Sequence, residues 1–189
     1  MTLRTLPAVF CILGATALHA AEPQAGMTAY VQENLVPQFS DATVQAAIRA
    51  ANSVHGDMTE EQIFTLDQAW RSEVGATSTP TITPVLESPV TEWLRGIVGE
   101  SAGMITEIIV MDNRGLNVAV SDVTSDYWQG DEAKYLETYA VGPDAVHVSE
   151  IELDESSQTY QGQVSFTVVD ANDGSPIGAV TVGLNAEFF

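Results

Sequence analysis

The sequence predicts a single α+β domain, with helices in the N-terminal half and an antiparallel sheet in the C-terminal half. Two patterns predict this division. Up to about Gly103 the apolar residues recur every three or four positions, as on one face of a helix. From Ile105 they alternate or form short runs bounded by turn residues, which is typical of strands. The length of 189 residues and a hydrophobic fraction of 45% suit one globular domain with a sizeable core.

Three helices in the N-terminal half are predicted from their capping residues. The first follows Ser40-Asp41, the second follows Thr59, and the third follows Ser88, whose neighbour is a proline in the first helical turn. The first two are expected to end at Gly56 and Gly75, because glycine favours the end of a helix. A weaker helix is expected over Met27 to Gln38.

The segment from Ala76 to Glu87 is rich in Thr, Ser and Pro, and it is expected to be a linker without regular structure. Five strands with one short helix among them should follow the third helix. Their expected extents are Ile105–Met111, Leu116–Val120, a helix over Asp131–Ala140, Val146–Leu153, a strand from Tyr160, and Ile177–Leu184.

The first twenty residues, Met1 to Ala20, predict a secretory signal. Arg4 supplies an early positive charge, and the apolar run from Leu6 to Leu18 is shorter than a membrane-spanning helix requires. Cleavage near Ala20 would place the protein in the periplasm or outside the cell. It would also remove Cys11, the one cysteine of the chain, so that no disulfide could form.

Beyond the signal, we expect residues 21–87 to form a helical region that packs on a sheet built from residues 88–189. The two parts are expected to form one domain, because the apolar stripes of the helices need the sheet to cover them. No internal repeat is visible.

The charge of the chain excludes several classes of partner. Asp and Glu number 26 against 6 Lys and Arg, which gives a formal net charge of −20. Phosphate backbones and anionic lipid surfaces would repel such a protein, so neither nucleic-acid binding nor peripheral membrane binding is expected.

Three stretches of the sequence resemble a known family. They are the strand-turn-strand from Ile108 to Ser121, the segment Asp126-Tyr127-Trp128-Gln129-Gly130-Asp131-Glu132, and the terminal Gly178-Ala179-Val180-Thr181-Val182-Gly183. Together they resemble the Cache domain, the extracytoplasmic PAS-like sensor module. The resemblance covers Met27 to Phe189.

The resemblance implies a single-Cache fold, with a five-stranded antiparallel sheet flanked by N-terminal helices and a small-molecule pocket over the sheet. In that family the loop after the second strand and the short helix beside it line the pocket, and these positions correspond to Ser121 through Tyr135. No kinase, cyclase or methyl-accepting segment is visible, so the chain resembles a free-standing periplasmic version. Its expected role is to bind a metabolite and present the complex to a partner such as a membrane sensor protein.

The candidate ligand-binding residues are Asp126, Tyr127, Trp128, Asp131 and Tyr135. Aromatic faces attract ammonium groups and carboxylates neutralise them, so this composition suits a cationic organic ligand. Members of the family that bind amino acids tend to have an arginine where Asp126 stands, which argues against recognition of that kind here. The competing interpretation is structural: acids are favoured at the start of a helix, and the aromatic rings could fill the core.

The sequence contains no catalytic motif, and neither a cofactor nor a metal site is expected. There is no Gly-x-Ser-x-Gly elbow and no glycine-rich phosphate loop. Asp122, Asp126 and Asp131 could offer oxygen atoms to calcium, but their spacing matches no standard calcium loop. The alternative to a binding module is therefore a structural or docking protein of the same fold that dimerises or docks through its N-terminal helices, and an enzyme comes third.

Overall fold

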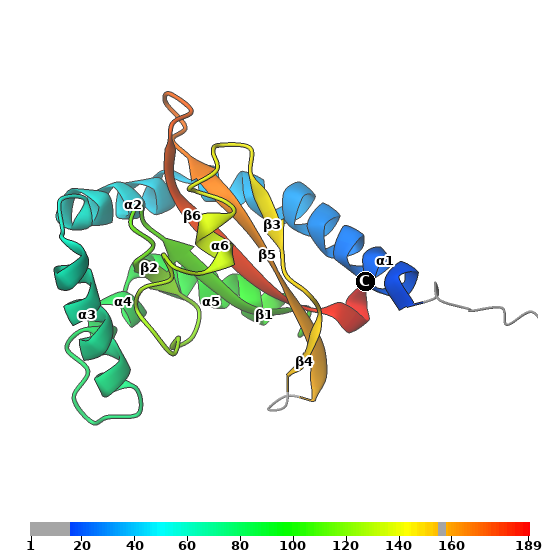
Figure 1. The fold of residues 1–189 in the computed structure, drawn as a ribbon, viewed down its shortest axis with the longest axis horizontal. Coiled ribbons are helices and arrows are strands. Elements are labelled where there is room, and N and C mark those ends of the chain that lie inside the picture. Colours follow the sequence, from blue (N-terminus) through cyan, green and yellow to red (C-terminus); the bar gives the residue numbers. More distant parts are fainter. Residues whose placement is uncertain (1–15, 155–157) are drawn as a thin grey trace, which may run out of the picture.

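A computed structural model of the protein describes residues 16–154 and 158–189. It confirms the predicted α+β class, with an antiparallel sheet between two groups of helices. In Figure 1, α1, α2 and α5 pass behind the sheet, α6 lies in front of it, and α3 stands at the end of the sheet beside β2.

The helices are, in chain order, α1 (Thr16–Tyr30), the π-helix η1 (Val31–Leu35), the 3-10 helix η2 (Val36–Ser40), α2 (Ala42–His55), α3 (Glu60–Glu73), α4 (Ile82–Leu86), α5 (Pro89–Glu100), α6 (Ala133–Leu136) and the 3-10 helix η3 (Ala186–Phe188). The strands are β1 (Ile105–Met111), β2 (Asn117–Val120), β3 (Val146–Val148), β4 (Glu152–Asp154), β5 (Thr159–Val169) and β6 (Pro176–Asn185).

The predicted helix caps are confirmed at α2, α3 and α5. Asp41 accepts hydrogen bonds from the amides of Thr43 and Val44 at the start of α2. Thr59 forms the predicted capping box at the start of α3, and Ser88 accepts the amide of Thr91 at the start of α5.

Three other expectations were wrong in extent. The weak helix expected over Met27 to Gln38 is longer, since it begins at Thr16 and continues through η1 and η2 to Ser40. The chain continues past Pro37 because this residue lies in the first turn of the 3-10 helix η2, which follows the π-helix η1. The expected linker contains α4, whose first amides are held by the buried carboxylate of Glu73. The helix expected over Asp131–Ala140 is a single turn, α6.

The sheet has the order β2-β1-β6-β5-β3, and every pairing is antiparallel. The strand expected over Val146–Leu153 is divided into β3 and β4, which pair with successive parts of β5. The break falls where the alternation of the sequence slips, between Val148 and Ile151, so the sheet keeps the width of five strands.

The two faces of the sheet differ in what covers them. On one face, α1, α2 and α5 bury the larger apolar core, whose members include Val31, Phe39, Ile48, Leu94, Ile108, Val110, Val164, Phe166, Val180 and Val182. On the other face a smaller cluster lies under α3, α4 and α6, and it includes Ile63, Trp70, Ile82, Ile109, Met111, Leu116, Tyr127 and Tyr135.

The expected signal segment, Met1 to Ala20, lies mostly outside the described residues, and its last five residues form the beginning of α1. Of the helices in the described ranges, none has both the length and the apolar character needed to cross a membrane.

Leu94 provides a test of the larger core. Its side chain is fully buried, so Leu94→Ala should lower the free energy of unfolding by about 2–5 kcal/mol through lost burial and the cavity left behind. Leu136→Ala is the matched control, because Leu136 is 47% exposed and its truncation should change stability by less than about 0.5 kcal/mol. Urea unfolding measures both, and equal losses would contradict the assignment of the core.

Candidate functional site

The turn between β1 and β2 anchors the candidate site. The buried carboxylate of Asp112 accepts hydrogen bonds from the amides of Arg114 and Leu116, at 2.8 and 3.0 Å. Its other oxygen lies 2.6 Å from Nδ1 of His55, the last residue of α2. The turn is thereby held both by its own amides and by a helix.

Further hydrogen bonds join this turn to the α2–α3 connection. The Nη1 group of Arg114 donates to the carbonyls of Gly56 and Met58, both at 2.9 Å. The amide of Asn113 donates to the Oδ1 atom of Asn52 at 2.8 Å. The first turn of α3 therefore has a fixed position relative to the β1–β2 hairpin.

The chain segment 121–132, which follows β2, folds back against the same turn. Leu116 pairs with Trp128 as an antiparallel bridge, and the amide of Gln129 donates to the carbonyl of Gly115 at 2.8 Å. Gly115 has a φ of 79°, and a Cβ atom there would lie 2.6 Å from the Cα atom of Gly130. Glycine is needed at position 115 both for the left-handed backbone and for this close approach.

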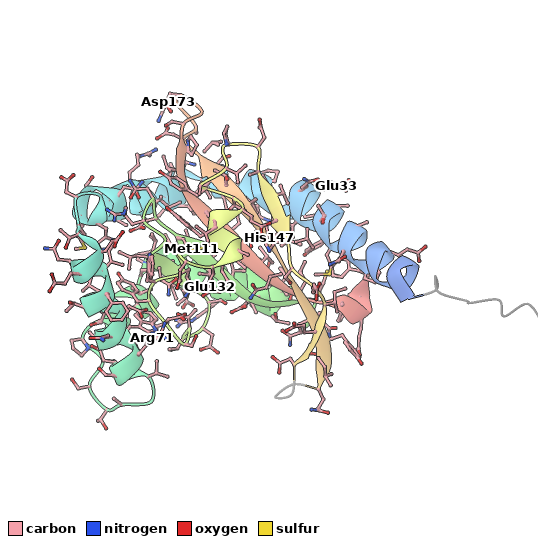
Figure 2. The ribbon with its side chains drawn as sticks, viewed as in Figure 1. Glu33, Arg71, Met111, Glu132, His147 and Asp173 are labelled. Carbon is pink, nitrogen blue, oxygen red and sulfur yellow. The ribbon has the colours of Figure 1, made fainter. Side chains whose placement is uncertain are left out.

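Asp67 of α3 holds the aromatic pair of the segment. One oxygen of its buried carboxylate accepts the amides of Tyr127 and Trp128, at 2.9 and 3.1 Å. The other oxygen accepts Nε of Arg71 at 2.6 Å, and Nη2 of Arg71 lies 3.2 Å from the carboxylate of Asp126. Arg71, labelled in Figure 2, thus links α3 to segment 121–132.

Tyr127 points away from solvent and belongs to the smaller core. Its ring stacks on that of Trp70, with centroids 5.0 Å apart and planes 7° from parallel. Trp70 in turn donates its indole N–H to the carbonyl of Thr124 at 2.8 Å. Burial raises the pKa of Tyr127 to about 12, and the nearby carboxylate of Asp112 adds to this increase.

Two cavities lie on either side of segment 121–132. The first, here called the sheet cavity, has a volume of about 300 Å³ and separates the segment from the sheet. Its principal polar residues are Glu107 and Gln163 from the sheet, and Asp126, Gln129, Glu132 and Lys134 from the segment and α6.

The polar groups of the sheet cavity are ordered by hydrogen bonds. Gln163 donates to Glu107 at 2.8 Å on the sheet side. On the opposite side, Gln129 donates to the carboxylate of Asp126 at 2.7 Å and accepts Nζ of Lys134 at 3.1 Å. The cavity therefore places carboxylates and one ammonium group within a small volume.

The second cavity, here called the helix cavity, has a volume of about 500 Å³ and lies between α3, the β1–β2 turn and α6. It is lined by Glu60, Glu61, Ile63, Phe64, Arg114, Trp128, Gly130 and Tyr135. Burial of Tyr135 raises the pKa of its phenol, so this hydroxyl stays protonated and donates to the carbonyl of Asn113 at 2.8 Å.

The structure does not bring the five candidate residues of the sequence together in one cavity. Asp126 lines the sheet cavity, whereas Trp128 and Tyr135 line the helix cavity. Tyr127 lies in the core between them, and Asp131 is exposed and lines neither cavity.

Four residues that sequence reasoning did not select define the geometry of the site: Lys134, Glu107, Gln163 and Asp67. Lys134 could have been noticed as one of few cations in an acidic chain. Glu107 and Gln163 alternate with core residues along their strands, so the period of two places them on the face away from the larger core. The role of Asp67 has no local signal, because its partners lie about 60 positions away in the sequence.

Asp122, Asp126 and Asp131 are the carboxylates of this segment that could offer oxygen atoms to a metal ion. Within residues 16–154 and 158–189, no three His, Cys, Asp or Glu side chains form a group that could hold a metal ion.

Substituting Asp67 should release segment 121–132 from α3. In Asp67→Ala the amides of Tyr127 and Trp128 lose a buried charged acceptor, so their hydrogen exchange should accelerate by at least about tenfold. Asp122→Ala, an exposed change in the same segment, is the control and should leave both amides protected. Exchange measured at single residues tests this, and unchanged protection in Asp67→Ala would show that other contacts hold the segment.

Because Tyr127 is buried, the free energy of unfolding depends on pH in the alkaline range. Because the pKa of Tyr127 is about 12 in the folded protein and about 10 when unfolded, only the unfolded state loses this proton between those values. The contribution of the protonated Tyr127 to the free energy of unfolding is complete below about pH 10 and is lost as the pH rises to about 12. Tyr127→Phe should therefore flatten the fall in the urea midpoint over this range, and an unchanged slope would contradict the burial of the hydroxyl.

The chain has distant structural similarity to several solved structures. No protein-family model matches the chain, and no curated protein sequence matches it. The sensor domain of the histidine kinase DctB from V. cholerae is 12% identical, with a TM-score of 0.43 over 89% of this chain and 50% of that one. The ligand-binding domain of the Pseudomonas aeruginosa PAO1 amino acid chemoreceptor PctC, in complex with GABA, is 16% identical, with a TM-score of 0.36 over 82% and 61%.

The sensory domain of the Campylobacter jejuni chemoreceptor Tlp3 with isoleucine bound is 14% identical, with a TM-score of 0.40 over 88% of this chain and 64% of that one. This chain thus spans between one half and two thirds of the length of these three structures. The three structures are sensor or ligand-binding domains.

Proposed function

We propose that the protein is an extracytoplasmic sensor module, in the periplasm or secreted, that binds a small metabolite in the sheet cavity. The observation that carries this proposal is the ordered set of opposite charges in that cavity. Lys134 is 13% exposed and shares its ammonium group between Gln129 and Glu132, while Asp126 and Glu107 present carboxylates to the same space. Such a few convergent polar groups over a sheet are what orient a small ligand.

The chemistry of the lining indicates a ligand that carries a primary ammonium group. Carboxylate and amide oxygens accept the hydrogen bonds that such a group donates. Lys134 can neutralise a carboxylate or bind a carbonyl at the other end of the ligand. The volume of about 300 Å³ limits the ligand to a small metabolite.

Asp126 connects the sheet cavity to helix α3 through Arg71. Its carboxylate is shared with Arg71, which is also held by Asp67 of α3. A ligand ammonium that takes over Asp126 would compete with Arg71 and change the contacts of α3. We propose that a partner, such as a membrane sensor protein, detects this change.

Binding is proposed in preference to catalysis because the cavity presents carboxylate, amide and ammonium groups that are hydrogen-bonded to one another. The second candidate function is a structural or docking protein that dimerises or docks through its N-terminal helices. It is favoured by the packing of Tyr127 on Trp70, since these rings fill the space where the sequence indicated part of a pocket.

A thermal-shift screen of amines, amino acids, carboxylates, purines and divalent ions tests the proposed function. A ligand with a primary ammonium group should raise the melting temperature by about 5 °C or more at a concentration near 100 times its Kd. Asp126→Asn and Lys134→Gln should each reduce this shift, because each removes one charge from the cavity.

Asp57→Asn is the control, because Asp57 is exposed and lies outside the lining of both cavities. If both cavity variants keep the full thermal shift, the ligand does not bind in the sheet cavity. If the protein melts cooperatively and no compound of the panel raises its melting temperature, the docking function is favoured instead.

A further inference from the structure

The helix cavity differs in chemistry from the sheet cavity. At about 500 Å³ it falls within the usual range for ligand sites, and aromatic rings and apolar side chains form much of its wall. Phe64 of α3 is 56% exposed and lines this cavity. It lies opposite the segment that carries Trp128, so an aromatic residue of α3 and one of segment 121–132 face the same space.

The polar atoms of Trp128 and Tyr135 already form hydrogen bonds within the protein. The indole N–H of Trp128 donates to the carbonyl of Arg114, and the hydroxyl of Tyr135 donates to the carbonyl of Asn113, both at 2.8 Å. The rings of Trp128 and Tyr135 therefore present carbon to the cavity, and their polar atoms are not available to a ligand. This environment disfavours a ligand that needs many hydrogen bonds.

Two carboxylates lie at the edge of the cavity. Glu60 and Glu61 are exposed, and within the described residues neither side chain forms an ion pair or a hydrogen bond. The cation in the wall, Arg114, is directed by its Nη1 group to the carbonyls of Gly56 and Met58. A positive ligand would find free negative charge at this edge.

The cavity is also built rigidly. A Cβ atom at Gly130 would collide with the indole of Trp128 and the carbonyl of Arg114, so the ring lies directly against this backbone. Trp128 and Tyr135 donate their hydrogen bonds to carbonyls of the same β1–β2 turn. A preformed site of this kind loses little conformational entropy when a ligand binds.

From these observations we infer that the helix cavity is a second binding site, for an organic cation with an alkylated ammonium group. Such a cation donates no hydrogen bonds, is attracted to aromatic faces and is neutralised by nearby carboxylates. A primary amine, which donates three hydrogen bonds, fits the sheet cavity better. The two cavities would thus separate two classes of amine, and this inference does not depend on the proposed function.

Calorimetric titration of the full chain with choline chloride tests the inference, with 3,3-dimethyl-1-butanol as the uncharged probe of the same shape. Choline should bind with a Kd of about 1 mM or tighter, and the uncharged probe should not bind. Phe64→Leu, Trp128→Leu and the double variant Glu60→Gln/Glu61→Gln should each weaken binding by about tenfold or more.

Phe188→Leu is the matched control for Phe64→Leu, because Phe188 is 49% exposed and lies on η3, away from the cavity. Phe64→Leu is the decisive variant, since an exposed ring can be removed without loss of the fold. Equal binding of both probes, no binding of choline, or the same affinity in Phe64→Leu and the parent protein would overturn the inference.

The two cavities can be told apart with one more variant. Lys134→Gln should leave choline binding unchanged while it reduces the thermal shift of a primary amine, because Lys134 lines the sheet cavity and pairs with Gln129 and Glu132 rather than with α3. Loss of choline binding in Lys134→Gln, with normal binding in Phe64→Leu, would assign choline to the sheet cavity and overturn the second site without affecting the proposed function.

Discussion

The buried carboxylate of Asp112 is the interaction on which the arrangement of both cavities depends. It closes the β1–β2 turn through two amides and pairs with His55 at the end of α2. The carbonyls of Arg114 and Asn113 in this turn then accept hydrogen bonds from Trp128 and Tyr135, which both line the helix cavity. Burying a charge is costly unless it is paired and hydrogen-bonded, so the β1–β2 turn and the end of α2 must come together when this carboxylate is buried.

The sheet separates two kinds of environment. Along β5 and β6 the side chains that face the helices are apolar, whereas those on the opposite face include the buried pair Ser165 and Thr181, whose hydroxyls lie 2.9 Å apart. The hydroxyls of Ser165 and Thr181 pair with each other, and Gln163 donates to Glu107 on the same face, so the polar groups of the sheet are hydrogen-bonded. Gln129 of segment 121–132 and Lys134 of α6 lie over this face, and the sheet cavity lies between the two polar layers.

Segment 121–132 has little regular structure, and its position is set by its neighbours. Asp67 and Trp70 of α3 hold it from one side, and the β1–β2 turn holds it from the other. Each cavity therefore has one wall formed by a loop whose anchors lie in α3. This arrangement explains why a change at Asp126, through Arg71, would be transmitted to a helix at the end of the molecule.

Local patterns in the sequence determined the class of the fold, the caps of α2, α3 and α5, and the break between β3 and β4, because caps and strand alternation depend on residues a few positions apart. Only the tertiary structure decided which candidate residues share a cavity. Asp126 and Trp128 are two positions apart, yet they line different cavities, because alternate side chains of an extended segment point to opposite sides. The contributions of Glu107 and Asp67 come from elements distant in sequence, whose approach depends on how the helices pack on the sheet.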